Sequence, residues 1–239
     1  MSRVTGFVNH AVRRASGRRL SRRLIQLYVG LALYGFSDAL IVIAGLGVDP
    51  WDVLHQGLAR RTGLGIGTWS IIVGALVLLA WLPLRQRPGL GTVSNVIVVG
   101  LGINATIALV PAPHNIVVRC AVLVAGVVLN GAATGCYIGA RLGPGPRDGL
   151  MTGLAARGHS VRVVRTAIEL TVLAAGWLLG GSVGIGTLLY AVAIGPLAHV
   201  FIPWLTVRER KPADDPRPTV TAAGRPSAET APAPATAQE

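Results

Sequence analysis

Six long apolar runs, separated by short polar stretches, set the pattern of this chain. They cover residues 24–46, 66–84, 92–110, 117–138, 163–180 and 187–205. Each has 18 to 23 residues, close to the ~20 that a helix needs to cross a hydrocarbon core of ~30 Å. The pattern predicts an all-α fold, a polytopic membrane helix bundle.

Two shorter segments, residues 50–61 and 146–157, interrupt this pattern. Twelve residues make a helix of about 18 Å, too short to cross, and both segments contain polar side chains. Each begins with Pro, which favours the first helical position, and has Asp two residues later, at the positive end of the helix dipole. They are predicted to be short helices, re-entrant or interfacial, although a model in which they also cross, with eight spans, is left open.

The two short segments belong to an internal repeat of 96 residues. The phrase at 46–61 recurs at 142–157 with nine identical positions, and such duplication indicates two copies of one structural unit. Three spans per copy predict that the second copy is inverted in the membrane, whereas four would keep the copies parallel. The backbone-shaping residues of the motif are Gly47, Pro50, Gly57, Gly143, Pro146 and Gly153.

Charge fits the six-span layout. The net charge is +12, and 13% of residues are charged, against about 25% in soluble domains. With the N-terminus in the cytoplasm, 19 of the 22 Lys and Arg residues lie inside, and Arg60, Arg61 and Arg119 outside, as the positive-inside rule requires. No basic face carries stacking aromatics, so anionic lipid at the cytoplasmic face, and no nucleic acid, is the expected partner.

These patterns divide the chain into four regions. Residues 1–23 are a basic cytoplasmic segment, whose first twenty residues are expected to be disordered or loosely helical. Residues 24–111 form the first membrane repeat, and residues 112–207 form the second. Residues 208–239 are rich in Pro, Ala and Thr, and they are expected to be a disordered cytoplasmic tail. Both termini are therefore predicted to be cytoplasmic.

The twin acids Asp52 and Asp148 are the first candidates for a functional site. If both short helices dip inward, these carboxylates face each other near the bilayer midplane, where inverted-repeat transporters bind substrate or ion. The ligand would be a cation, a proton or an amine-bearing solute. The alternative is structural, because each Asp can cap the N-terminus of its own helix.

Three further ionisable residues lie inside predicted spans. Arg165 and Glu169 are four residues apart, so they share one helix face. Asp38 lies about two-thirds along the first span and needs a partner on another helix, water or a proton. Ionised groups at such depth are costly and indicate either function or a structural ion pair.

Other patterns indicate packing. Gly131, Gly135 and Gly139 form a small-residue stripe that lets helices approach closely, and between the two repeats it would serve as their contact. The two Cys residues are too far apart on one predicted helix for a disulfide. No phosphate loop, nucleophile elbow or zinc-protease motif occurs. We therefore expect no enzyme, no catalytic residue, no cofactor and no metal site.

The stretch from Leu46 to Pro196 resembles bacterial integral membrane proteins of the YczE-like group, related to the YitT family. The matching residues lie at 45–52, 89–92, 142–149 and 163–170, and the Gly-Pro-Arg-Asp-Gly and Arg-Thr-x-x-Glu-Leu pieces are specific. The resemblance implies a multi-pass protein of the bacterial inner membrane and suggests a transporter or permease role.

Two functions follow from these features. The first is a small secondary transporter or permease-like protein, with Asp52, Asp148, Arg165 and Glu169 around a central polar site. The second is a non-transporting scaffold or regulatory subunit of a larger membrane complex, in which the glycine stripe and the tails would contact a homodimer mate or another membrane partner.

Overall fold

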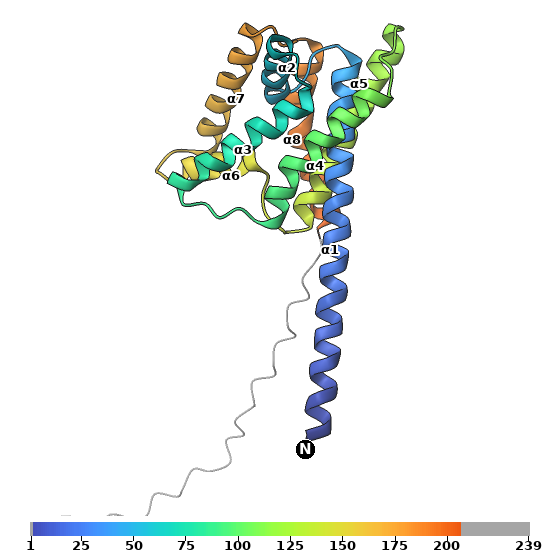
Figure 1. Ribbon diagram of the computed structural model, residues 1–239, viewed down its shortest axis with the longest axis vertical. Coiled ribbons are helices and arrows are strands. Elements are labelled where there is room, and N and C mark those ends of the chain that lie inside the picture. Colours follow the sequence, from blue (N-terminus) through green and yellow to red (C-terminus); the bar gives the residue numbers. More distant parts are fainter. Residues whose placement is uncertain (1, 207–239) are drawn as a thin grey trace, which may run out of the picture. The chain divides into compact units, whose positions relative to one another are not determined.

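The computed structural model describes residues 2–206, and all regular structure in this part of the chain is α-helical (Figure 1). The helices are α1 (Ser2–Ala44), α2 (Pro50–Thr62), α3 (Ile66–Leu84), α4 (Leu90–Leu109), α5 (Ile116–Gly139), α6 (Pro146–Ala155), α7 (Val161–Leu178) and α8 (Ile185–Leu205). The predicted all-α membrane fold class is confirmed.

Five helices of the described part are long and apolar enough to cross a membrane: α1 from Leu20 onward, α3, α4, α5 and α8. Large apolar side chains are exposed on them, such as Leu82 on α3 and Leu101 on α4, as a lipid-facing surface requires. The remaining predicted span is α7, which has 18 residues and carries Arg162, Arg165 and Glu169.

The N-terminal region continues the helix of the first span. Helix α1 begins at Ser2 and continues without a break to Ala44, so the basic residues extend the helix of the first span. Its N-terminal part projects beyond the other helices (Figure 1). The predicted tail, residues 208–239, lies outside the described residues.

The short helices begin where the sequence indicated. Pro50 and Pro146 are the first residues of α2 and α6. Helix α2 ends at Thr62 and is followed by the cap residue Gly63, whose φ of 77° is in the left-handed region that glycine adopts readily. Helix α6 is shorter than predicted because it ends at Ala155.

Helices α1 and α5 pack along each other in opposite directions. The guanidinium of Arg23, near the middle of α1, donates to the carbonyls of Ala140 and Arg141 at the end of α5. Arg119, early in α5, donates to the carbonyls of Ala44 and Gly45 at the end of α1. Each Arg thus satisfies carbonyls that a helix end leaves without partners.

The two copies also exchange backbone hydrogen bonds. The N–H of Gly186, at the start of α8, donates to the carbonyl of Leu46, and the N–H of Gly91, at the start of α4, donates to that of Leu142. Gly47 and Gly143 follow these carbonyls with φ of 106° and 130°, a conformation that a side chain would strain. The repeated Leu-Gly pairs therefore join one copy to the other.

The last residue of the repeated phrase makes a third exchanged contact. Arg61 donates to the carbonyl of Leu179 beyond α7, and Arg157 donates to that of Pro83 in α3. Accordingly, α2 packs on α7 and α6 packs on α3. Each short helix therefore lies against a helix of the other copy.

The two copies differ in one respect. Helix α3 packs on α4, whereas the corresponding helices α7 and α8 are not packed together in this way among the described residues. Trp81 in α3 is buried and donates its indole N–H to the carbonyl of Pro146. Its sequence counterpart in α7, Trp177, is 65% exposed. Helix α7 therefore stands apart from α8.

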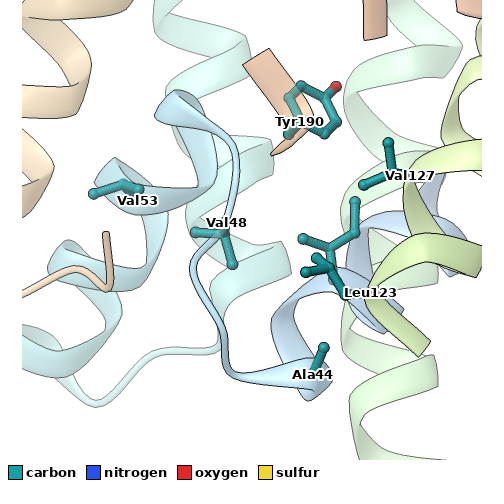
Figure 2. Close-up of a cluster of buried hydrophobic side chains, with 7 residues drawn as sticks. Ala44, Val48, Val53, Leu123, Val127 and Tyr190 are labelled. Atoms are coloured by element: carbon teal, nitrogen blue, oxygen red, sulfur yellow. The ribbon is translucent and has the colours of Figure 1, made fainter. Parts of the chain in front are cut away.

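A cluster of buried apolar side chains joins α1, α2, α5 and α8 (Figure 2). It consists of Ile41, Ala44, Val48, Val53, Leu123, Val127 and Tyr190. Because Val48 lies in the connection between α1 and α2, this core fixes the path of the chain that leads into α2. It thereby positions the polar residues at the start of that helix.

Candidate functional site

The N-terminal ends of the two short helices meet in the interior. Arg147 of α6 lies 3.5 Å from Asp49 and 4.0 Å from Asp52, measured from guanidinium nitrogen to carboxylate oxygen. Its guanidinium also lies 5.0 Å from the ring centroid of Trp51, a cation–π contact. These residues come from both copies of the repeat, so the copies share one polar centre.

Asp49 caps α2. Its Oδ1 accepts hydrogen bonds from the backbone N–H groups of Trp51 and Asp52, at 2.9 and 3.2 Å. In α6 the capping position is Gly145, which has no side chain to do this. Capping by Asp52 and Asp148, the structural alternative from the sequence, is therefore wrong. A cap lies before the first helical residue, and these two acids lie inside the first turn.

Asp52 is bonded to His55 one turn later. The Nδ1–H of His55 donates to Asp52 Oδ1 at 2.9 Å, and both side chains are almost completely buried. Asp52 Oδ2 and His55 Nε2 have no hydrogen-bond partner among the described residues. Buried polar atoms of this kind are rare in proteins, so they mark this pair as a candidate binding position.

Asp38 of α1 lies close to Asp49 and Asp52 and is hydrogen-bonded to a residue of α5. Its Oδ1 accepts a hydrogen bond of 2.6 Å from the amide of Asn130, which also donates to Ser37 and accepts from Tyr190. This network supplies the interhelical partner that the sequence analysis required for Asp38. Asp38 Oδ2, however, has no partner among the described residues.

Burial controls the protonation of the α2 residues. Burial raises the pKa of Asp49 to about 7, and the Asp52 carboxylate adds to this rise while Arg147 opposes it. Burial raises the pKa of Asp52 as well, against the lowering effect of Arg147. The pKa of His55 falls to about 3 because burial and Arg147 both disfavour its charged form. His55 is therefore neutral at physiological pH.

A cavity of about 550 Å³ lies beside this cluster. Its polar lining includes Asp49, His55, Arg147, Asp148, Arg165 and Glu169. Apolar residues of α3, α4 and α8 complete the wall. A cavity of this size, largely apolar with a few ionisable groups, is typical of a site for a small molecule.

The predicted ion pair of α7 forms at the edge of this cavity. Arg165 Nε donates to Glu169 Oε1 at 2.9 Å, with Arg165 half exposed. Asp148 Oδ2 accepts a longer hydrogen bond of 3.3 Å from the hydroxyl of Tyr137. Burial raises the pKa of Asp148, while Arg165 lowers it. Asp148 is thus the cavity carboxylate with the weakest partner.

The structure divides the predicted site residues into two groups. Asp148, Arg165 and Glu169 line the cavity, whereas Asp38 and Asp52 lie in the buried cluster behind it. Asp52 is hydrogen-bonded to His55 and Asp148 to Tyr137, so the two acids of the repeat have different partners.

Sequence reasoning missed Asp49, His55 and Arg147. Asp49 directly precedes Pro50, and this Asp-Pro pair is itself a signal for a capped helix start. His55 follows Asp52 by three residues, a spacing that places both on one helix face. Arg147 has no such local signal, because its partners lie in the other copy.

The motif glycines lie at close helix contacts. A Cβ on Gly57 would meet the backbone of Gly176 in α7, and one on Gly153 would meet Gln86 and Leu84. The stripe of Gly131, Gly135 and Gly139 lies against residues 197, 201 and 205 of α8, so it packs within the second copy and not between the copies. Since α8 covers this stripe, it offers no free surface to a partner.

Fold and site together define a helical membrane protein with an ionisable centre and an adjoining cavity. The model of a family of unknown function, DUF6198, matches residues 21–203. The chain belongs to this family, which is the YczE-like group of membrane proteins.

Three relatives support this assignment. The chain is 42% identical to an uncharacterized protein of Haemophilus influenzae over 74% of its length and 81% of the relative's. It is 37% identical to the uncharacterized membrane protein YczE of Bacillus subtilis over 74% and 83% of the two chains. It is 29% identical to the uncharacterized protein YyaS of the same organism, over 73% and 90%. No solved structure matches the chain.

Proposed function

We propose that this protein is a small secondary transporter or permease of the bacterial inner membrane, and that the cavity is its solute site. The observation that carries the proposal is the cavity of about 550 Å³, lined by ionisable groups from both copies of the repeat. Solute sites at the junction of two repeats, beside broken or short helices, are typical of secondary transporters.

The antiparallel packing of equivalent helices supports an inverted arrangement of the copies. Arg23 and Arg119 occupy matching positions of α1 and α5, and each binds the end of the other helix. The exchanged bonds of Leu46 and Leu142 follow the same two-fold pattern. An inverted pair gives two related conformations, open to opposite sides of the membrane.

The side chains in the cavity favour a solute with a protonated amine and a small apolar body. Both cavity arginines already have carboxylate partners: Arg147 has Asp49 and Asp52, and Arg165 has Glu169. Among the described residues, the carboxylate of Asp148 accepts one side-chain hydrogen bond, the long one from Tyr137, so a cationic group can pair with it. The apolar wall and Trp51 would contact the rest of the solute.

Flux through proteoliposomes tests the proposal. The purified full chain is screened against amines, amino acids, organic anions and sugars by electrophysiology on supported membranes. We expect Asp148→Asn to reduce flux of the transported solute at least about tenfold, the loss typical of one charged contact. Arg162→Gln is the matched control, because Arg162 is exposed and does not line the cavity.

Each variant is checked for folding by its elution profile and its melting temperature in detergent. A folded Asp148→Asn protein that carries solute at the wild-type rate contradicts the proposed solute site. Absence of flux for all four solute classes in the wild-type protein contradicts the transporter proposal itself.

A further inference from the structure

The carboxylates of Asp38, Asp49 and Asp52 converge in the interior. Each offers an oxygen atom, and these atoms all lie within 4.8 Å of one another. Asp38 comes from α1, and the other two come from the start of α2, which the connection at 45–49 turns back toward α1. We propose that these three residues bind a hard metal cation of the size of Na⁺ or Ca²⁺ beside the solute cavity.

The charges of the cluster are not balanced by the surrounding side chains. Among the described residues, the one cationic side chain in contact with these carboxylates is Arg147. Its guanidinium nitrogens lie 3.5 Å from Asp49 and 4.0 Å from Asp52. His55 contributes a hydrogen bond to Asp52 Oδ1. Two negative charges stay uncompensated when all three acids are ionised, and buried charge of this kind is strongly unfavourable without a counter-ion.

Unused acceptor atoms give independent support. Asp38 Oδ2 and Asp52 Oδ2 are buried and have no hydrogen-bond partner among the described residues. The second oxygen of each carboxylate is held in place, by Asn130 for Asp38 and by His55 for Asp52. Carboxylates that are oriented by such outer partners and have one free oxygen are arranged as metal ligands usually are.

The donor atoms and their spacing define the class of ion. Oxygen-only ligands select hard cations and disfavour soft metals. Oxygens within 4.8 Å of one another can share one ion whose metal–oxygen distances are near 2.4 Å. Mg²⁺ is disfavoured because it requires near-ideal octahedral geometry and loses its water reluctantly. Ca²⁺ balances both excess charges, and Na⁺ balances one while a proton on the cluster balances the other.

The second copy lacks an equivalent site. The positions that match Asp38 and Asp49 are Thr134 and Gly145, so Asp148 is the one acid retained there. The site is therefore asymmetric, although the repeat is duplicated. The inference goes beyond the proposed function because cation binding is measured without any solute and without transport.

Thermal unfolding of the purified full chain in detergent tests the inference. The protein is stripped with a chelator, transferred to choline chloride, and melted with NaCl, CaCl₂, KCl or MgCl₂ at equal ionic strength. We expect Na⁺ or Ca²⁺ to raise the melting temperature by about 5 °C near saturation, with K⁺ and Mg²⁺ less effective. The NaCl and CaCl₂ arms identify which ion binds. Stability that responds to pH but to none of these salts overturns the proposal.

Two isosteric variants locate the ion. Asp38→Asn and Asp52→Asn should each weaken binding at least tenfold by titration calorimetry, while Arg162→Gln, at an exposed residue that does not line the cavity, should leave it unchanged. Equal binding by folded Asp38→Asn and Asp52→Asn overturns the assignment.

If these variants do not fold, Tb³⁺ luminescence of the wild-type protein decides. Trp51 adjoins the site, so we expect indole-sensitised emission that Ca²⁺ or Na⁺ displaces and that Trp51→Phe reduces. No sensitised emission, or emission that neither ion displaces, overturns the proposal.

Discussion

At the scale of single residues, the interior is organised around side chains whose partners lie far away in sequence. Asp49, Asp52 and Arg147 form one centre although about a hundred residues separate them. The sequence marks Asp52 and Asp148 as equivalent, yet one bonds His55 and the other bonds Tyr137. The same residue type therefore stands at both positions of the sequence repeat, and its surroundings differ between them.

His55 gives a prediction about pH. Its folded pKa of about 3 lies below the usual value of about 6.5, so below pH 6.5 the unfolded chain binds the proton and stability falls as pH falls. Asp49, with its raised pKa, acts in the opposite direction between about pH 4 and 7. We expect His55→Gln to remove the histidine contribution, so that its stability relative to wild type rises by about 2 kcal/mol from pH 7.5 to pH 5.

The measurement is unfolding of both proteins in detergent across this pH range. The Asp49 contribution is present in both, so the difference between them reports on His55. A difference that does not change with pH would show that the buried ring titrates as it does in the unfolded chain.

Gly149 gives a prediction about packing. A Cβ at this position would overlap the indole of Trp81, which is buried and bonded to Pro146. Overpacking of this kind costs about 1–3 kcal/mol, so Gly149→Ala should lower the unfolding free energy by about 2 kcal/mol. Gly195→Ala is the control, because nothing lies near its Cβ position in α8. If both variants melt alike, Trp81 is not held as described.

At the scale of elements, helix ends connect the two copies. Arg23 and Arg119 bind the ends of α5 and α1, and Arg61 and Arg157 bind the carbonyls of Leu179 and Pro83. Each interaction has its counterpart 96 residues away. The elements are therefore tied by pairs of equivalent polar contacts in addition to apolar packing.

The arginine pair allows a test of independence. Arg23→Gln and Arg119→Gln should each lower the unfolding free energy by about 1 kcal/mol, since a charged donor to backbone carbonyls is lost. One site lies near the middle of α1 and the other at its C-terminal end, about 30 Å apart, so their effects should add in the double variant. A double variant no weaker than either single one would indicate that the two contacts act as one unit.

The hydrophobic pattern predicted these elements well, and it predicted less of the site. The bounds of α3 agree with the apolar run, and the prolines locate the starts of α2 and α6. The pattern could not place Arg147 beside Asp49, because their approach depends on how two distant copies pack. The basic residues before the first span suggested a separate segment, but helix α1 begins at Ser2. The helix can include them because Arg has a high helix propensity.

At the scale of the whole molecule, the charge pattern and the helix order predict the orientation in the membrane. The connection before α5 and the one before α7 are predicted to lie on opposite sides of the membrane. His114 and His159 are exposed residues in these two connections. Their exposure makes both positions suitable for a labelling test of the membrane topology.

In a cysteine-free background with Cys120 and Cys136 replaced by Ser, we expect His114→Cys to react with a membrane-impermeant maleimide added to intact cells. His159→Cys should react only after the membrane is permeabilised. Labelling of both positions from outside would contradict the predicted orientation, and the reverse pattern would place the termini outside.

The bonds from Leu46 to Gly186 and from Leu142 to Gly91 set an order for assembly of this chain. When the ribosome has released the first four helices, the carbonyl of Leu46 and the N–H of Gly91 still lack their partners. The early helices therefore complete their hydrogen bonds to the second copy only after α8 has been inserted. A protein cut between α4 and α5 would yield two fragments, neither of which completes its own fold, and each would need the other in the same bilayer.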